Sequence, residues 1–177
     1  MSSKHPFVIG ITRLRKAPGS VVRFELLGRI SDLKVAASRV SEDEDIAVAG
    51  TAESVHGGIL ITATISTRWN GECRRCLEPA FGELEISVRE LFERAEPGST
   101  PSSEGDTYPY TGDFIDLQDM VKDQIVLELP LAPVCKADCK GLCPSCGADL
   151  NLGPCGCEKT TKDPRWSVLD VLAEKDR

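Results

Sequence analysis

The chain has 177 residues, of which 41% are hydrophobic, and its formal net charge is −7. A chain of this length and composition can bury its own core, so its eight cysteines are not needed merely to hold a tiny scaffold together. The acidic balance argues against non-specific binding to nucleic acid as the main activity, because phosphate contacts need a basic surface.

The charge is unevenly distributed along the chain. Residues 1–25 carry +4 and residues 135–177 carry zero, which leaves −11 for the middle. An acidic body with a basic N-terminal end suits a basic protein partner, or a partner that mixes protein and RNA. The alternative is an acidic surface that only keeps the protein soluble.

The start of the chain has a short apolar patch at residues 7–11 but lacks the basic start, apolar stretch and cleavage site of a signal peptide. No run approaches the roughly 18 apolar residues of a membrane span. We therefore expect a cytoplasmic protein that makes no contact with a membrane. In a reducing cytosol, clustered cysteines are more often metal ligands than disulfides.

The first half of the chain has the pattern of an antiparallel sheet. Residues 6–30 read as extended segments around a turn at Pro18-Gly19. Apolar residues alternate from Ile46 and again over residues 59–65, with Gly57-Gly58 between the two runs, which predicts a hairpin. Residues 81–91 suggest a third strand, and the alternation indicates one buried face.

A Pro/Ser/Gly-rich stretch follows at residues 95–113, and we expect it to be a flexible surface loop inside the domain. Apolar residues then recur at helical spacing, which predicts a helix that has Asp116 as its N-cap and ends at Pro130. A last short helix is expected over residues 166–173, where Asp163 can cap it.

The cysteines fall into four close pairs with the spacings C-x2-C, C-x3-C, C-x2-C and C-x-C. Two sets of four thiolates are what two tetrahedral metal sites require. Two cysteines separated by two residues can turn both sulfurs toward one ion, and a following glycine eases the tight turn. The eight residues are Cys73, Cys76, Cys135, Cys139, Cys143, Cys146, Cys155 and Cys157.

One predicted site is local. Residues 143–147 read Cys-Pro-Ser-Cys-Gly, the form of a zinc knuckle, and residues 155–157 read Cys-Gly-Cys. The two pairs are close in the sequence, so closing the loop between them costs little. The predicted ligands are Cys143, Cys146, Cys155 and Cys157.

The other four cysteines predict a long-range site, which would join the hairpin region to the C-terminal segment and clamp the loop between them. Its ligands would be Cys73, Cys76, Cys135 and Cys139. A competing arrangement groups residues 135 and 139 with residues 143 and 146, and leaves Cys73 and Cys76 for the last pair. The spacing favours the first arrangement and leaves the second open.

A structural metal is favoured over redox switching, because the chain lacks the thioredoxin-like βαβ pattern around a reactive C-x2-C. Zinc fits the paired spacings and the knuckle glycine, although spacing alone does not exclude iron. His5 and His56 lie outside the cysteine clusters, and no catalytic sequence motif is present. We therefore expect no enzymatic activity.

Residues 73–79 read Cys-Arg-Arg-Cys-Leu-Glu-Pro, which resembles the motif C-x-R-C-L-x-P of the bacterial YceD family. Further matching segments are residues 123–130 (DQIVLELP), 133–135, 138–147, 149–151 (DLN), 155–157 and 163–166 (DPRW). The resemblance covers most of the chain, and its cysteine segment is highly specific.

The family is described as large ribosomal RNA subunit accumulation proteins. The resemblance implies a non-enzymatic factor that promotes 23S ribosomal RNA accumulation and large ribosomal subunit assembly, and it brings no catalytic residues. The implied partner is ribosomal RNA or a basic large-subunit ribosomal protein, such as L32, whose gene commonly neighbours that of the family. The alternative is a redox- or metal-responsive regulatory module, which the thiol density suggests.

Arg74 and Arg75 lie inside the first knuckle, the C-x2-C turn of residues 73–76, where side chains project outward. Both are candidates for contact with RNA or a partner. The alternative for both is simple solvent exposure. We expect a single YceD-like α+β domain over residues 1–177. It would have an antiparallel sheet, two or three helices and a cysteine-rich zinc-knuckle segment at residues 135–157.

Overall fold

The computed structural model describes residues 6–95 and 107–157. Strands hold about 45% of these residues and helices 11%. In chain order the elements are β1 (Val8–Gly10), α1 (Thr12–Lys16), β2 (Val21–Gly28), β3 (Lys34–Val35), β4 (Ser38–Arg39), β5 (Ile46–Val55), β6 (Gly58–Glu72), β7 (Pro79–Arg94), β8 (Tyr108–Tyr110), β9 (Phe114–Asp116) and α2 (Gln118–Glu128). Within the described ranges, no helix is long and apolar enough to cross a membrane.

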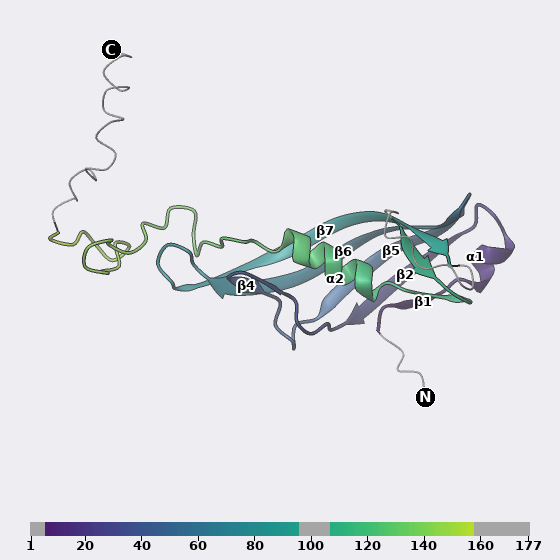
Figure 1. The fold of residues 1–177 in the computed structure, drawn as a ribbon, viewed down its shortest axis with the longest axis horizontal. Coiled ribbons are helices and arrows are strands. Elements are labelled where there is room, and N and C mark those ends of the chain that lie inside the picture. Colours follow the sequence, from purple (N-terminus) through teal and green to yellow (C-terminus); the bar gives the residue numbers. More distant parts are fainter. Residues whose placement is uncertain (1–5, 96–106, 158–177) are drawn as a thin grey trace, which may run out of the picture.

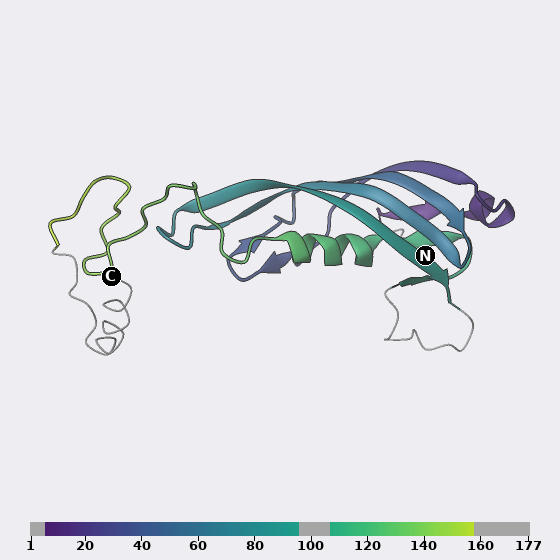
Figure 2. The ribbon, with the colours of Figure 1, turned by 90° about the horizontal axis from the view of Figure 1, so that it is seen from above.

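One long sheet forms the body of the molecule. Its strands follow the order β2-β5-β6-β7, all antiparallel, and the short β8 lies parallel to the end of β7. The short β4 and β3 continue from β6 beyond the point where β5 ends. β1 and β9 form a separate two-stranded sheet. Figures 1 and 2 show the long strands as one twisted layer, with α2 lying along one of its faces.

The tight turn between β5 and β6 depends on glycine. Val55 pairs with Gly58, so only His56 and Gly57 connect the two strands. Gly57 has a φ of +97°, in the left-handed region that residues with a Cβ avoid. The hairpin predicted around Gly57-Gly58 is therefore present.

The core lies between one face of the sheet and α2. Side chains of β6 alternate, so that Ile59, Ile61 and Ile65 are buried while Thr62 and Ser66 face solvent. Opposite them, the N-terminal segment, β9 and α2 with its N-cap contribute the fully buried Phe7, Ile11, Leu14, Ile115, Leu117, Met120, Val121 and Ile125. The opposite face of the sheet has no such cover among the described residues.

Two hydrogen bonds fix the ends of α2. The predicted N-cap, Asp116, lies one residue too early, because Leu117 occupies the N-cap position and makes no side-chain cap hydrogen bond. The carboxylate of Asp116 still accepts the backbone N–H of Gln118, the first helical residue, at 2.9 Å. After the helix, the hydroxyl of Ser38 donates to the carbonyl of Pro130 at 2.7 Å. This bond ties β4 to the segment that leads from α2 to the last six cysteines.

The predicted α+β class with two or three helices is wrong, because the protein is dominated by its sheet. Among the described residues only α2 is a helix of ordinary length, and α1 has five residues within the segment predicted to be extended. The strands β6 and β7 reach 15 and 16 residues. In β6 the alternation of buried and exposed side chains continues past Ile65 to the buried Thr67. A polar residue at a buried position gives no hydrophobic signal, so the sequence pattern does not reveal the full length of the strand.

Two predicted features fall on parts of the chain that the structure does not describe. The helix predicted over residues 166–173 lies outside the described residues, and so do residues 96–106 of the loop predicted at 95–113. Of the remaining loop residues, 108–110 form β8 and pair with the end of β7.

Candidate metal centre

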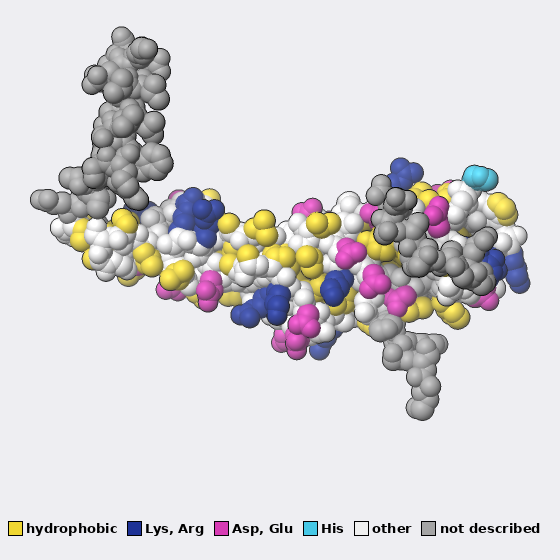
Figure 3. All heavy atoms as spheres, viewed as in Figure 1, with side chains coloured by type: hydrophobic (Ala, Val, Ile, Leu, Met, Phe, Trp, Pro, Cys, Tyr) yellow, Lys and Arg dark blue, Asp and Glu magenta, His cyan; other side chains and the backbone are white. Residues whose placement is uncertain are grey.

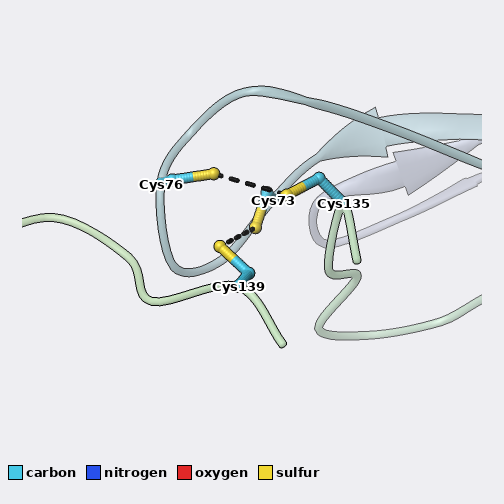
Figure 4. A group of neighbouring side chains, drawn as sticks. All are labelled: Cys73, Cys76, Cys135 and Cys139. Carbon is cyan, nitrogen blue, oxygen red and sulfur yellow. Dashed lines mark hydrogen bonds between the residues drawn. The ribbon is translucent and has the colours of Figure 1, made fainter. Parts of the chain in front are cut away.

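The first group of cysteines joins two distant parts of the chain. Cys73 and Cys76 lie in the connection between β6 and β7, and Cys135 and Cys139 lie in the segment after α2. Figure 4 shows the four side chains pointing toward one another. The backbone N–H of Arg74 donates to the carbonyl of Pro133 at 2.9 Å, so the two segments are also tied directly.

The distances between these sulfurs fit a tetrahedral site. The Sγ atoms of Cys73 and Cys139 are 3.8 Å apart, and those of Cys76 and Cys135 are 3.6 Å apart. All four lie within 4.8 Å of one another. Four sulfurs placed about 2.3 Å from one zinc ion would be about 3.8 Å apart, whereas a disulfide would need about 2.05 Å. The four free cysteines can therefore hold one metal ion.

Neighbouring N–H groups and burial act in opposite directions on these thiols. Burial opposes ionisation of Cys73, but N–H groups of Cys135, Arg75 and Cys76 outweigh it and lower its pKa to about 6. An N–H group of Glu78 acts to lower the pKa of Cys76, yet burial and the adjacent sulfurs raise it to about 12. A divalent cation would replace the protons that such crowded sulfurs otherwise retain.

The second group is built within one short segment. Cys143, Cys146, Cys155 and Cys157 have their sulfurs within 4.8 Å of one another, so they too can hold a metal ion. N–H groups of Cys146 and Ser145 lower the pKa of Cys143 to about 6. The thiol of Cys157 donates to the sulfur of Cys146, and this bond, followed by burial, raises the pKa of Cys157 to about 12.

The C-x2-C turns of the two groups have the same backbone hydrogen bonds. The N–H of Leu77 donates to the carbonyl of Cys73, as that of Gly147 does to Cys143, each at 2.9 Å. In both turns the residue directly after the second cysteine has a left-handed φ, which is +66° at Leu77 and +75° at Gly147. Leu77 therefore occupies the position that glycine holds in the second turn, where a left-handed φ favours glycine. Its side chain is 65% exposed.

Asn151 connects the two groups. It lies in the loop between Cys146 and Cys155, yet its side-chain amide donates to Sγ of Cys139 at 3.5 Å. Its carbonyl oxygen accepts the N–H of Lys140 at 2.9 Å. The loop of the second group thus supports a sulfur of the first.

The turn at Gly141 brings the segment between the two groups against the first knuckle. The N–H of Leu142 donates to the carbonyl of Arg75 at 3.0 Å. Gly141 has a φ of +75°, and a Cβ there would lie 2.9 Å from the same carbonyl oxygen. Only glycine allows this close approach without displacement of the backbone.

The structure groups the cysteines in the arrangement that their spacing favours, and not in the competing one. The two arginines of the first knuckle differ in their contacts. The guanidinium of Arg75 donates to the carbonyls of Cys139 and Ala137, at 2.9 and 3.4 Å. Arg74 is exposed, and Figure 3 shows basic side chains beside acidic ones at the cysteine-rich end of the molecule.

Sequence reasoning missed the roles of Asn151 and Leu77. The only signal for Asn151 is its place in the Asp149-Leu150-Asn151 segment between two cysteine pairs. Asp149 holds it in position by accepting its backbone N–H at 2.8 Å and its amide at 2.7 Å. The contact with Cys139 depends on tertiary structure and could not be read from spacing.

Comparison with known proteins gives relatives along nearly the whole chain. An uncharacterized protein of Mycobacterium tuberculosis is 36% identical over 172 residues, which cover 93% of this chain and 80% of the relative. The Bacillus subtilis protein YlbN, also uncharacterized, is 26% identical over 167 residues, covering 94% of this chain and 96% of its own length. No solved structure matches the chain significantly.

Two further matches carry a description. The chloroplastic "Large ribosomal RNA subunit accumulation protein YCED homolog 1" of Arabidopsis thaliana is 36% identical over 61 residues, or 34% of this chain and 19% of the relative. A family model described as "Large ribosomal RNA subunit accumulation protein YceD" matches residues 61–173, a range that contains both cysteine groups. The resemblance inferred from the cysteine motifs is thereby confirmed, and the chain belongs to the YceD family.

Proposed function

We propose that this chain is a non-enzymatic factor that promotes accumulation of 23S ribosomal RNA and assembly of the large ribosomal subunit. The observation that carries the proposal is the family match over residues 61–173, together with the family's description. The long sheet and the cysteine groups supply a scaffold for binding, and we assign no catalytic step to any residue.

The partner we propose is ribosomal RNA or a basic large-subunit ribosomal protein such as L32, met in the cytoplasm. The net charge of −7 supports a basic protein more than bare RNA. Arg74 is the more available of the two arginine candidates, since the guanidinium of Arg75 already bonds to two carbonyls.

We propose that each cysteine group holds one structural zinc ion, within a single domain whose segment 135–157 supplies six of the eight ligands. Four thiolates match the closed coordination of structural zinc. The purified protein should contain two zinc ions per chain. A content of one ion, or of iron, would contradict this assignment.

The function can be tested in a bacterium from which the gene has been deleted. The ratio of 23S to 16S ribosomal RNA should fall and should be restored by the wild-type gene. A tagged wild-type chain should also recover large-subunit RNA or protein from lysate. An unchanged ratio, with no large-subunit component recovered, would overturn the proposal.

A redox- or metal-responsive module is the second candidate, and the lowered pKa values of Cys73 and Cys143 favour it. Thiol titration and metal analysis of the same sample separate the two functions. Metal-filled, unreactive thiols support the assembly factor, whereas metal-free thiols that oxidise reversibly support the switch.

A further inference from the structure

The sheet ends in β2, whose outer edge is unpaired among the described residues. β2 bonds to β5 on one side only. The N–H of Ser54 donates to the carbonyl of Ser20, so even-numbered residues of β2 bond to β5 and odd-numbered ones point outward. Val21, Arg23, Glu25 and Leu27 therefore each present one N–H and one C=O to a possible partner.

β2 lacks the features that usually protect an edge strand. It contains no proline, and the side chains of Val21 and Leu27 are 54% and 63% exposed. Arg23 and Glu25 are its only charged residues, and neither forms a salt bridge within the part of the chain that the structure describes. An open edge with apolar residues at both ends and one charge of each sign between them favours pairing with a strand of complementary charge.

The opposite edge of the sheet differs. α2 packs against β7, and the amide of Gln124 donates to the carboxylate of Glu90 at 3.2 Å. The end of β7 also pairs with β8. This edge is therefore occupied by β8 at one end, over residues 92–94, whereas β2 has no partner on its outer side among the described residues.

We propose that β2 pairs antiparallel with β2 of a second copy of this chain, about a two-fold axis at Phe24. This register places Arg23 opposite Glu25 of the other copy, twice, and Val21 opposite Leu27, twice. All four pairs join outward-pointing residues, so their backbone groups can bond across the interface. Shifting the register by two residues would instead oppose Arg23 to Arg23 or Glu25 to Glu25.

The side chains on the core-facing side of β2 would also pair favourably in this register. Val22, Phe24 and Leu26 pack against the core but remain partly exposed. In the proposed register Phe24 meets Phe24, and Val22 meets Leu26. Pairing would thus cover apolar surface on both faces of β2 and join two sheets into one.

Charge reversal tests the register, with sedimentation equilibrium as the measurement. The wild-type chain should dimerise, and Arg23→Glu should weaken the dimer about tenfold or more, because two attractive cross-strand pairs become repulsive. Glu25→Arg should do the same. The double variant R23E/E25R should dimerise like the wild type, and an equimolar mixture of the two single variants should form heterodimers.

Arg89→Glu is the matched control, since Arg89 is exposed on the same face of the sheet but lies in β7. It changes the net charge equally and should leave the dimer unchanged. Circular dichroism would verify that each variant is folded. A monomeric wild-type chain would overturn the proposal, and so would an R23E chain that dimerises fully or a double variant that stays monomeric.

Discussion

The side-chain amide of Asn151 lies 3.5 Å from the sulfur of Cys139, although the two residues belong to different cysteine groups. An N–H group directed at a thiolate stabilises its charge, and Asn151 contributes to the lowered pKa of Cys139 after the opposing effect of burial. Through this contact, the loop of the local group supports the long-range group.

Replacing Asn151 should therefore weaken metal binding at the proposed long-range site without removing any ligand. We expect Asn151→Ala to weaken metal binding by Cys73, Cys76, Cys135 and Cys139 about tenfold or more, as changes to residues that support metal ligands commonly do. Chelator competition should show one of two ions released earlier than in the wild type. Asn70→Ala, which removes an amide from β6, is the control and should leave both ions in place.

Serine variants of the two groups should differ in their effect on the fold. Cys73→Ser should reduce the metal content from two ions to one and lower the melting temperature markedly, because this group ties the β6–β7 connection to the segment after α2. Cys143→Ser should also remove one ion but lower the melting temperature less, since its group is local and reaches the first group through Asn151. Equal melting temperatures for the two variants would contradict this difference.

The metal-free protein should show a defined pH dependence. The pKa of Cys73 and of Cys143 is lowered from 9.0 to about 6, so their contribution to stability is present above pH 9 and is lost as the pH falls toward 6. The raised pKa of Cys76 and of Cys157, about 12, acts oppositely and reduces stability as the pH rises from 9 toward 12.

Thermal melts of the chelator-treated protein, recorded across this range, measure the effect. The melting temperature should be highest near pH 9, and Cys143→Ser should flatten the acidic limb. Thiolate absorbance should begin to rise near pH 6 rather than near the ordinary pKa. A melting temperature that rises steadily as the pH falls from 9 toward 6 would contradict this prediction.

Leu77 and Gly147 occupy equivalent positions in the two C-x2-C turns, so we expect replacing the glycine and introducing a glycine to have opposite effects on stability. Gly147→Leu should cost about 1–2 kcal/mol, because a residue with a Cβ is strained at a φ of +75°. Leu77→Gly relieves the same strain and exposes no core, so it should be neutral or stabilise by less than about 1 kcal/mol. Urea unfolding of the zinc-loaded protein would give both values.

Helix α2 offers a matched pair for the core. Ile125 is fully buried, whereas Leu127, two residues later, is 76% exposed. We expect Ile125→Ala to lower the free energy of unfolding by about 2–5 kcal/mol and Leu127→Ala to change it by less than about 0.5 kcal/mol. Similar losses in urea unfolding would show that Leu127 is buried in solution.

Local pattern was enough to predict the hairpin at Gly57, a helix beginning beside Asp116 and the division of the cysteines into two groups. Each depends on residues close in sequence: a glycine turn, a carboxylate just before a run of helical spacing, or ligand pairs at short spacing. These signals do not require knowledge of how distant segments pack.

The balance of strand and helix could not be predicted in the same way. The far ends of β6 and β7 contain Thr67, Arg68 and Glu83, which carry little hydrophobic signal, and they are strands because they pair with each other. The placement of Asn151 likewise depends on the approach of two segments after folding. Such tertiary effects override the local preferences on which sequence reasoning rests.

The long-range cysteine group also bears on the order of biosynthesis. Cys73 and Cys76 leave the ribosome well before Cys135 and Cys139, with β7, β8, β9 and α2 made in between. Four-sulfur coordination at this group can therefore be completed only after the whole sheet and its covering helix have been synthesised. Capture of the ion would thus mark a chain whose folding unit is finished, and a truncated chain would be left with an incomplete ligand set.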